Sequence, residues 1–415
     1  MRITRRLSAA AFGVLLAASA FCQSLPVAGR PEDVGISSER LARIHRQMQA
    51  DVETGRIPGA VMLIARQGKI AWLDALGFEE RKSQTPMKSD GIFRIASMTK
   101  PIISVAAMTL AEEGKLDIGA PVAHYLPEFK DVRVGVEKAA PKRPMTVQDL
   151  LRHTSGLTYG IFGNSPVDEL YKKSGFFASK SLADMVTAIA SLPLEHQPGE
   201  YWEYSVSTDV LGRIVEVASG MPLDRFVAER ITGPLKMLDT GFYLNASQAA
   251  RLARPDSATA MAATDPTMKP AVLSGGGGLF STAGDYARFC QMMLNGGELV
   301  GVRILSPKTV ALMTSDQLPS STDRHTSVAM MLDALGPTPE MGTSFGLGFA
   351  VRTAAGRNPM PGSAGDFSWA GIMGTYFWVD PQEKLAAVLM IQVPMATNVP
   401  YWRQTRQLVY QAIVN

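Results

Sequence analysis

The sequence predicts an α/β (α+β) fold: an antiparallel sheet flanked by helices is built from both chain ends, and a mainly helical subdomain is inserted between them. Two observations predict it. Short apolar runs typical of strands lie near both ends of the 415-residue chain, and helical patterns dominate the segment between them. We therefore expect an α/β domain made of residues 30–109 and 270–415, a helical subdomain over residues 110–269, and a cleft where the two meet.

The N-terminal part of the predicted α/β domain begins with a helix and a hairpin. In "SSERLARIHRQMQADVETG", Leu41, Ile44, Met48 and Val52 recur at helical spacing, with serines before them and Gly55 behind. This pattern predicts an amphipathic helix with an N-cap and a stop. The apolar runs "GAVMLIA" and "KIAWLDALG" follow, joined by "RQGK", and predict a β-hairpin.

The middle and the far end of the chain complete the predicted architecture. Helical patterns in the middle include "TVQDLLRHTSG", "SLADMVTAIASL", "STDVLGRIVEVASG" and "PLDRFVAERIT". Near the C-terminus, "GTYFWVD" and "KLAAVLMIQV" predict two strands separated by the turn "DPQE", and "WRQTRQLVYQAIVN" predicts a closing helix.

The first 20 residues predict a secretory signal peptide. Three arginines lie within the first six residues, and an apolar run over residues 7–18 leads to "ASA", with cleavage expected after Ala20. The run is shorter than the ~20 apolar residues that cross a membrane, so we expect no transmembrane segment in the mature chain. The protein is therefore expected in the periplasm or outside the cell, and "TRR" leaves twin-arginine export open beside the general route.

Cysteine content and charge exclude several classes of protein. The two cysteines offer neither a disulfide framework nor a thiolate metal site. A lipid anchor on Cys22 is disfavoured because bulky Phe21 precedes it, and Cys290 is spaced as an apolar helix residue. The formal charge of +3 is spread along the chain without a basic block interleaved with aromatics, which disfavours nucleic acid as a partner.

Ser97 and Lys100, in "SMTK", form the candidate catalytic pair. Residues three apart on a helix share a face, so the hydroxyl and the amine are expected to project together. Pro101 follows and is best tolerated in a first helical turn, which places Ser97 near a helix N-terminus. A serine needs a neighbouring base to become a good nucleophile, and lysine is such a base when burial disfavours its charged form. The structural alternative is a capping serine with an exposed lysine.

Tyr204 is the candidate third member of the site. It stands in "PGEYWEYSVSTDVLGRIVE", shortly after a Pro-Gly turn and at the start of an apolar helical run. A tyrosine beside Ser97 and Lys100 would relay a proton to the leaving group. A packing aromatic is the structural alternative.

Together these stretches resemble the serine β-lactamase and penicillin-binding-protein superfamily, in particular its class C-like branch, over nearly the whole mature chain. Ser97-x-x-Lys100 matches its first motif, and "YSV" stands where the superfamily has Tyr-x-Asn. The segments "LLRHTSGL" and "GGGGLFSTAGDYARF" resemble recurring segments of the same branch. The resemblance implies a serine β-lactamase-like fold and an acyl-enzyme mechanism.

At two positions the chain departs from the superfamily's motifs, and both departures favour esters as the substrate class. Where the superfamily's β-lactamases and peptidases carry Lys-Thr-Gly or His-x-Gly, this chain reads Trp369-Ala370-Gly371, so an indole replaces the cation that would bind a substrate carboxylate. Val206 replaces the asparagine of Tyr-x-Asn. The Trp-x-Gly form resembles the family VIII carboxylesterases. We therefore expect Trp369, Gly371 and Val206 to contact the substrate.

Other catalytic classes lack their signatures here. Without a G-x-S-x-G elbow, an α/β-hydrolase is disfavoured. Gly275–Gly278 are not followed by the Lys-Ser/Thr of a phosphate loop, and predict a close backbone passage. By the resemblance, His153 has a structural role. The other histidines lack the spacing of a metal site, so no metal is expected.

The function expected from the sequence is a secreted serine hydrolase that cleaves short-chain carboxylic esters. Ser97 would form the acyl-enzyme, with Lys100 and Tyr204 as general base and acid, and no cofactor is required. By the resemblance, the backbone N–H groups of Ser97 and Ile372 form the oxyanion hole. Two alternatives stay open: an amide-directed relative (a β-lactamase, D-amino-acid peptidase or acyltransferase), and a catalytically silent binding or assembly protein with the same fold.

Overall fold

An eight-stranded antiparallel sheet forms the centre of the computed structural model, which describes residues 24–415 apart from 257–263, 333–334, 356 and 394. The strand order is β3-β2-β1-β12-β11-β10-β9-β8, so β1, from one chain end, pairs with β12, from the other. The predicted antiparallel sheet built from both chain ends is thereby confirmed. The predicted signal peptide (1–20) and Cys22 lie outside the described residues, and export stays a prediction.

The strands follow the apolar runs of the sequence. The predicted N-terminal hairpin is β1 with β2, and the predicted C-terminal pair is β11 with β12. The sheet consists of β1 (Gly59–Arg66), β2 (Lys69–Glu80), β3 (Thr85–Pro86), β8 (Thr343–Phe345), β9 (Ala350–Arg352), β10 (Phe367–Ala370), β11 (Tyr376–Asp380) and β12 (Leu385–Ile391). Both faces of β1 and β12 are buried, which explains why these strands read as continuous apolar runs.

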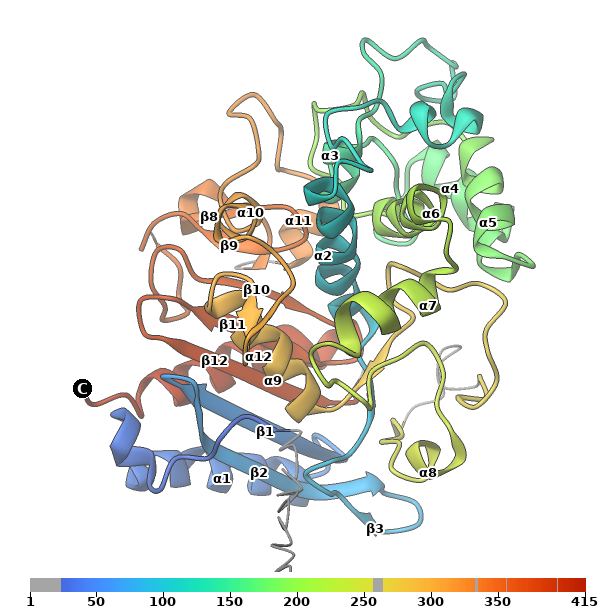
Figure 1. Cartoon of the computed structure of the whole chain (residues 1–415). Helices are drawn as coiled ribbons and strands as arrows, with labels where there is room; N and C mark the ends of the chain where they lie inside the picture. The colour runs from blue at the N-terminus through green and yellow to red at the C-terminus, as the bar shows by residue number, and fades with distance from the viewer. Residues whose placement is uncertain (1–23, 257–263, 333–334, 356, 394) are drawn as a thin grey trace, which may run out of the picture.

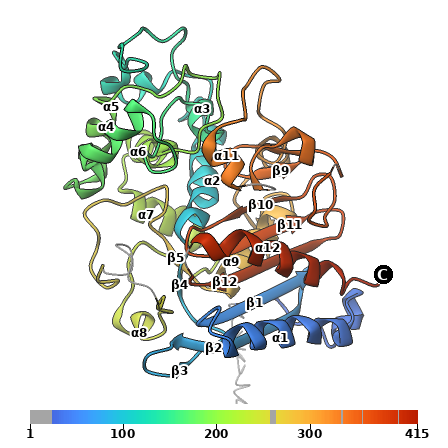
Figure 2. The same cartoon turned by 180° about the vertical axis from the view of Figure 1, so that it is seen from behind.

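Helices cover the two faces of the sheet. On one face, α1 (Ser38–Glu53) and α12 (Met395–Tyr410) pack over the side chains of Met62 and Trp378 (Figure 2). On the other face, α9 (Ala283–Leu294) packs over Leu63 and Phe377 (Figure 1). Alternate residues of a strand point to opposite faces, so each central strand contributes to two separate cores.

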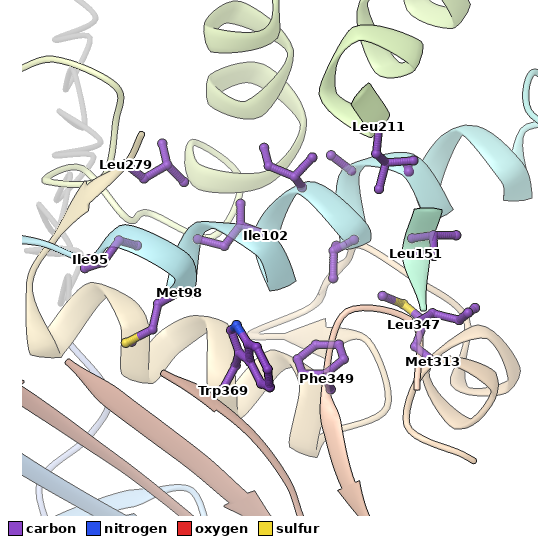
Figure 3. Close-up of a cluster of buried hydrophobic side chains, with 14 of the residues drawn as sticks. Ile95, Met98, Ile102, Leu151, Leu211, Leu279, Met313, Leu347, Phe349 and Trp369 are labelled. Atoms are coloured by element: carbon purple, nitrogen blue, oxygen red, sulfur yellow. The ribbon is translucent and has the colours of Figure 1, made fainter. Parts of the chain in front are cut away.

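The helical part of the molecule lies beside the sheet, and α2 (Thr99–Glu112) runs between the two (Figure 1). Every residue of α2 from Thr99 to Leu110 is buried, which is typical of a helix enclosed on all sides. Figure 3 shows Leu211 on one side of α2, with Phe349 and Trp369 on the sheet side. Of the other helices, α6 (Ser207–Ser219) and α7 (Leu223–Val227) contact α2. The remaining described helices are α3 (Val147–Leu151), α4 (Pro166–Ser174), α5 (Leu182–Ala190), α8 (Ala246–Ala249), α10 (Pro307–Met313) and α11 (Ser327–Leu332).

A two-stranded ribbon connects the sheet side to α2. Its strands are β4 (Phe93–Arg94), which lies just before α2 in the chain, and β5 (Phe280–Ser281), which lies just before α9; the two pair antiparallel. A further short pair is β6 (Glu298–Leu299) with β7 (Val302–Arg303). Within the described residues, none of the helices has the length and apolar character needed to cross a membrane.

Candidate active site

Ser97 lies on a strained turn at the entrance to α2. The turn is a short 3-10 helix, Ala96–Met98, and Ala96 adopts φ 44, a left-handed conformation that is costly for a residue with a Cβ. Neighbouring elements hold the turn in place: the Tyr286 hydroxyl donates to the Met98 carbonyl (2.8 Å), and the Thr99 hydroxyl accepts from the Leu279 backbone N–H (3.0 Å). The serine is therefore fixed two residues before α2 begins.

Lys100 lies directly beside Ser97 and is almost completely buried, at 1% exposure. Its Nζ donates to Ser97 Oγ (3.2 Å), to the Tyr159 hydroxyl (2.9 Å) and to the Gly276 carbonyl (2.7 Å). A neutral amine has two N–H groups and one lone pair. In that form Lys100 could keep two of these contacts as donor and accept the Ser97 proton through the third. The geometry thus suits a Ser–Lys nucleophile and base.

Tyr204, expected as the third member, borders the same cavity but makes a different contact. Its hydroxyl accepts a hydrogen bond from the Trp369 indole N–H (3.3 Å), and its ring centroid lies 4.6 Å from Lys100 Nζ. The side chain is 5% exposed. The structure therefore brings Tyr204 to the site, with its ring rather than its hydroxyl nearest to the lysine amine in the contacts described.

Tyr159 is a site residue that the sequence reasoning missed. Its hydroxyl makes the hydrogen bond to Lys100, and its ring lies 5.5 Å from that of Tyr204. Burial, with a smaller contribution from Asp209, raises the pKa of Tyr159 well above its usual value, so its hydroxyl keeps its proton near neutral pH. The available signal was its place in "LLRHTSGLTYG", directly after a segment that carries the family resemblance.

Asp209 is a second residue that the sequence reasoning missed. It positions the glycine-rich loop, residues 275–278, whose Gly276 carbonyl contacts Lys100. Its Oδ1 accepts from the Ser274 hydroxyl (2.6 Å) and from the Gly276 backbone N–H (3.0 Å), which fixes the carbonyl that Lys100 bonds. A Cβ on Gly276 would lie 2.4 Å from Asp209 Oδ2 and 2.8 Å from the Tyr159 hydroxyl, so only glycine fits. This is the close backbone passage predicted for residues 275–278. Burial raises the pKa of Asp209, while Lys100 opposes that rise.

The end of β10 forms the cavity wall beside the nucleophile turn. Trp369, Gly371 and Ile372 all line the cavity, as does Ser97. A Cβ on Gly371 would lie 2.5 Å from the Ile95 carbonyl, so glycine allows β10 to approach the nucleophile turn closely. The Thr375 hydroxyl donates to the same carbonyl (3.2 Å) and joins the two segments.

Val206, expected to contact the substrate, lies behind Tyr204 in the core rather than among the described residues that line the cavity. Its side chain is fully buried, at 0% exposure, and it does not line the cavity around Ser97. It is the residue before α6, and its carbonyl accepts from the backbone N–H groups of Asp209 and Val210. The apolar side chain packs in the core that holds Tyr204, and the expected contact of Val206 with the substrate stays a prediction.

His153 packs behind Tyr204, in keeping with the structural role expected for it. Its ring lies 4.9 Å from the Tyr204 ring, and its Nδ1 accepts from the Ser205 backbone N–H (3.3 Å). Burial, and secondarily Lys100, lowers the pKa of His153 well below its usual value. The imidazole is therefore neutral, and its described hydrogen bonds hold the segment that carries Tyr204.

The cavity at Ser97 is large and mainly apolar, with a volume of about 1020 Å³. Its walls come from the helical part, from the β5 region and from the sheet side, and include Phe162, Phe177, Phe242, Leu335 and Trp402. Apolar walls with a few convergent polar groups are typical of a small-molecule site.

A sheet built from both chain ends, a helical part beside it and a Ser–Lys pair at the start of a buried helix together define a serine hydrolase of the β-lactamase-like class. The chain belongs to the Beta-lactamase family, whose model matches residues 44–409.

Relatives of this chain include an esterase and a hydrolase. Esterase EstB of Burkholderia gladioli is 30% identical over 379 residues, covering 84% of this chain and 89% of that protein. An uncharacterised Mycobacterium tuberculosis protein is 37% identical over 357 residues, covering 82% and 87%. The solved structure of EstCE1, described as a hydrolase with promiscuous acyltransferase activity, superposes with a TM-score of 0.76 at 28% identity and covers 90% and 99%.

Proposed function

We propose that this serine hydrolase cleaves short-chain carboxylic esters through an acyl-enzyme on Ser97. The observation that carries the proposal is the contact between Ser97 Oγ and the buried Lys100 amine at the edge of an apolar cavity. Trp369 lines this cavity and stands, by the family resemblance, where β-lactamases and peptidases carry a lysine or histidine. The relationship to esterase EstB and the likeness to EstCE1 support the ester assignment.

In the first half-reaction, Ser97 Oγ attacks the ester carbonyl and its proton passes to Lys100 Nζ. The negative charge moves to the carbonyl oxygen, where the backbone N–H groups of Ser97 and Ile372 would stabilise it. One such donor is typically worth ~100- to 1,000-fold in rate. The proton then passes to the departing alcohol as the carbon–oxygen bond breaks.

In the second half-reaction, water attacks the acyl-enzyme and gives its proton back to Ser97 Oγ through the same base. Tyr204 would relay protons between Lys100 and the leaving group. Tyr159 would hold the lysine amine in place, because its hydroxyl keeps its own proton and is hydrogen-bonded to Nζ. The two tyrosines thus have different tasks in the proposed mechanism.

Phenylalanine substitutions separate these tasks. We expect Tyr204→Phe to lower kcat for p-nitrophenyl butyrate by roughly 100-fold, the range for loss of a general acid–base group. Tyr159→Phe should lower it by about 10-fold, because one hydrogen bond to the lysine is lost. Stopped-flow acylation rates and thermal unfolding of both variants provide the measurement. Wild-type acylation by Tyr159→Phe would show that its contact with Lys100 is dispensable.

Selectivity for esters over β-lactams should depend on Trp369. A short acyl chain gains burial of roughly 0.8 kcal/mol per methylene, about fourfold in binding, until the pocket is full. A carboxylate placed against the indole would instead lose water without gaining a partner. We therefore expect a higher kcat/KM for p-nitrophenyl butyrate than for nitrocefin. Trp369→Lys should lower ester turnover and raise the nitrocefin-to-butyrate ratio.

The matched control for that variant is Trp369→Phe, which keeps an apolar ring and adds no charge. Its selectivity ratio should stay close to that of the wild type. A wild-type preference for nitrocefin would overturn the esterase assignment in favour of the β-lactamase alternative. Hydrolysis of D-Ala-D-Ala peptides in preference to both would favour a peptidase instead.

A further inference from the structure

Arg94 places a buried cation in the wall of the cavity that contains Ser97. It belongs to β4 and is 8% exposed. Its Nη2 donates to the Thr264 carbonyl (2.8 Å), and its guanidinium carbon lies 4.8 Å above the centre of the Phe280 ring. Thr264 and Phe280 line the same cavity, so the guanidinium lies between two groups that border it.

Within the part of the chain that the structure describes, no ion pair to a carboxylate is recorded for Arg94: its described contacts are the Thr264 carbonyl and the Phe280 ring, and Arg254 is the charged group that acts on its pKa. Asp265, the acidic residue among the described cavity-lining side chains, accepts instead from the Thr267 backbone N–H and hydroxyl, both at 2.8 Å. Burial, and secondarily Arg254, lowers the pKa of Arg94 to about 10, so the guanidinium remains charged at neutral pH.

A buried charge that lacks an ion-pair partner is costly to the folded protein, unless a ligand supplies the partner. A guanidinium has five N–H donors in a planar fork that matches a carboxylate. One donor contact, to a carbonyl, is described for Arg94. The Phe280 ring and the mainly apolar cavity wall lower the local dielectric constant, and Arg254 adds a second positive charge nearby, so both would strengthen the interaction with an incoming anion.

The position of Arg94 also limits where such an anion would lie relative to the chemistry. Arg94 is three positions before Ser97 in the chain, so their Cα atoms are at most ~11 Å apart. The two side chains line one continuous cavity of about 1020 Å³. The acyl chain of a butyrate ester fills a small part of that space. A longer apolar segment could join the reacting carbonyl to an anion at Arg94.

We propose that Arg94 binds a carboxylate carried by the ester substrate, separated from the scissile carbonyl by an apolar segment. The substrate class is then the half-ester of a medium-chain dicarboxylic acid. This inference rests on the proposed esterase function and names its substrate more closely. It also agrees with Trp369, because the two residues reach the cavity from different sheets: β10 offers an indole there, while β4 offers a cation.

The test compares p-nitrophenyl half-esters of adipic and suberic acid with the neutral p-nitrophenyl hexanoate and octanoate of equal carbon number. Wild-type kcat/KM should be at least as high for one of the anionic esters as for its neutral counterpart. Arg94→Met should lower that anionic-to-neutral ratio by about 10-fold or more, the scale of a charge-assisted hydrogen bond. Arg94→Lys should restore part of the ratio, because it keeps the charge without the fork.

A higher wild-type kcat/KM for the neutral ester at both lengths, or an anionic-to-neutral ratio that Arg94→Met leaves unchanged, would overturn the inference and leave the esterase function standing. Failure to hydrolyse any of the four esters would overturn both. If Arg94→Met does not fold, the anionic-to-neutral kcat/KM ratio of the wild type is measured at low and at high salt. We expect the anionic ester to be preferred at both. The ratio should change little with salt, because the pair of Arg94 and the substrate carboxylate is buried. A preference for the neutral ester at both salt concentrations contradicts it.

Discussion

Ser97→Ala is expected to abolish hydrolysis, with kcat/KM for p-nitrophenyl butyrate falling roughly a thousand-fold or more, as when other hydrolases lose their nucleophile. The reason is geometric. Ser97 Oγ contacts the amine of Lys100 on a turn held from several sides, and the alanine variant leaves the base without a hydroxyl to activate. Covalent labelling by a fluorophosphonate should vanish at the same time, and thermal unfolding should change little.

Ser179→Ala is the matched control. Ser179 also lines the cavity, but it makes no described hydrogen bond to Lys100. Labelling should persist in that variant, and a peptide map of the labelled wild type should place the adduct on Ser97. Comparable turnover by Ser97→Ala and the wild type would rule out the proposed acyl-enzyme. It would also revive the alternative of a silent binding protein whose apparent activity comes from elsewhere.

Strand positions were predictable because the apolar runs near the two chain ends become buried strands of the sheet. The apolar runs that become β1 and β12 are buried on both faces, so their sequences contain almost nothing polar. That these strands share one antiparallel sheet could be predicted from the fold class, but not which residues lie opposite one another. The register, with Leu63 opposite Val388, depends on packing between chain ends more than 300 residues apart, for which no local spacing is informative.

The catalytic pair was predictable because Ser97 and Lys100 belong to one local segment, whereas the rest of the site was not. Tyr159 reaches Lys100 from a loop 59 residues away, and the Gly276 carbonyl comes from 176 residues away. Such contacts are made by tertiary folding, and a single sequence carries no spacing rule for them. The burial of Val206 was unpredictable for the same reason: the motif gave its place beside Tyr204 in the sequence, but not the direction of its side chain.

Arg94 illustrates a third kind of limit. In the sequence it is a single arginine between apolar residues and invites no functional reading. Its interest comes from its burial, from the Phe280 ring beneath it, and from its described hydrogen bond to a carbonyl in the wall of the cavity that contains Ser97. Each of these is a property of the folded environment. Sequence patterns therefore indicated the chemistry of the nucleophile better than the identity of the substrate.

Lys100→Arg should reduce kcat/KM as far as Lys100→Ala does, by roughly a thousand-fold. Arginine keeps the positive charge but stays protonated at any working pH, so it cannot accept the Ser97 proton. Nor does the larger guanidinium fit a position where one nitrogen contacts Ser97, Tyr159 and the Gly276 carbonyl within 3.2 Å. Single-turnover acylation by p-nitrophenyl butyrate measures the step directly, and thermal unfolding of both variants controls for folding. If the arginine enzyme kept a large share of the acylation rate, Lys100 would act only through its charge, and the base would have to be sought elsewhere in the site.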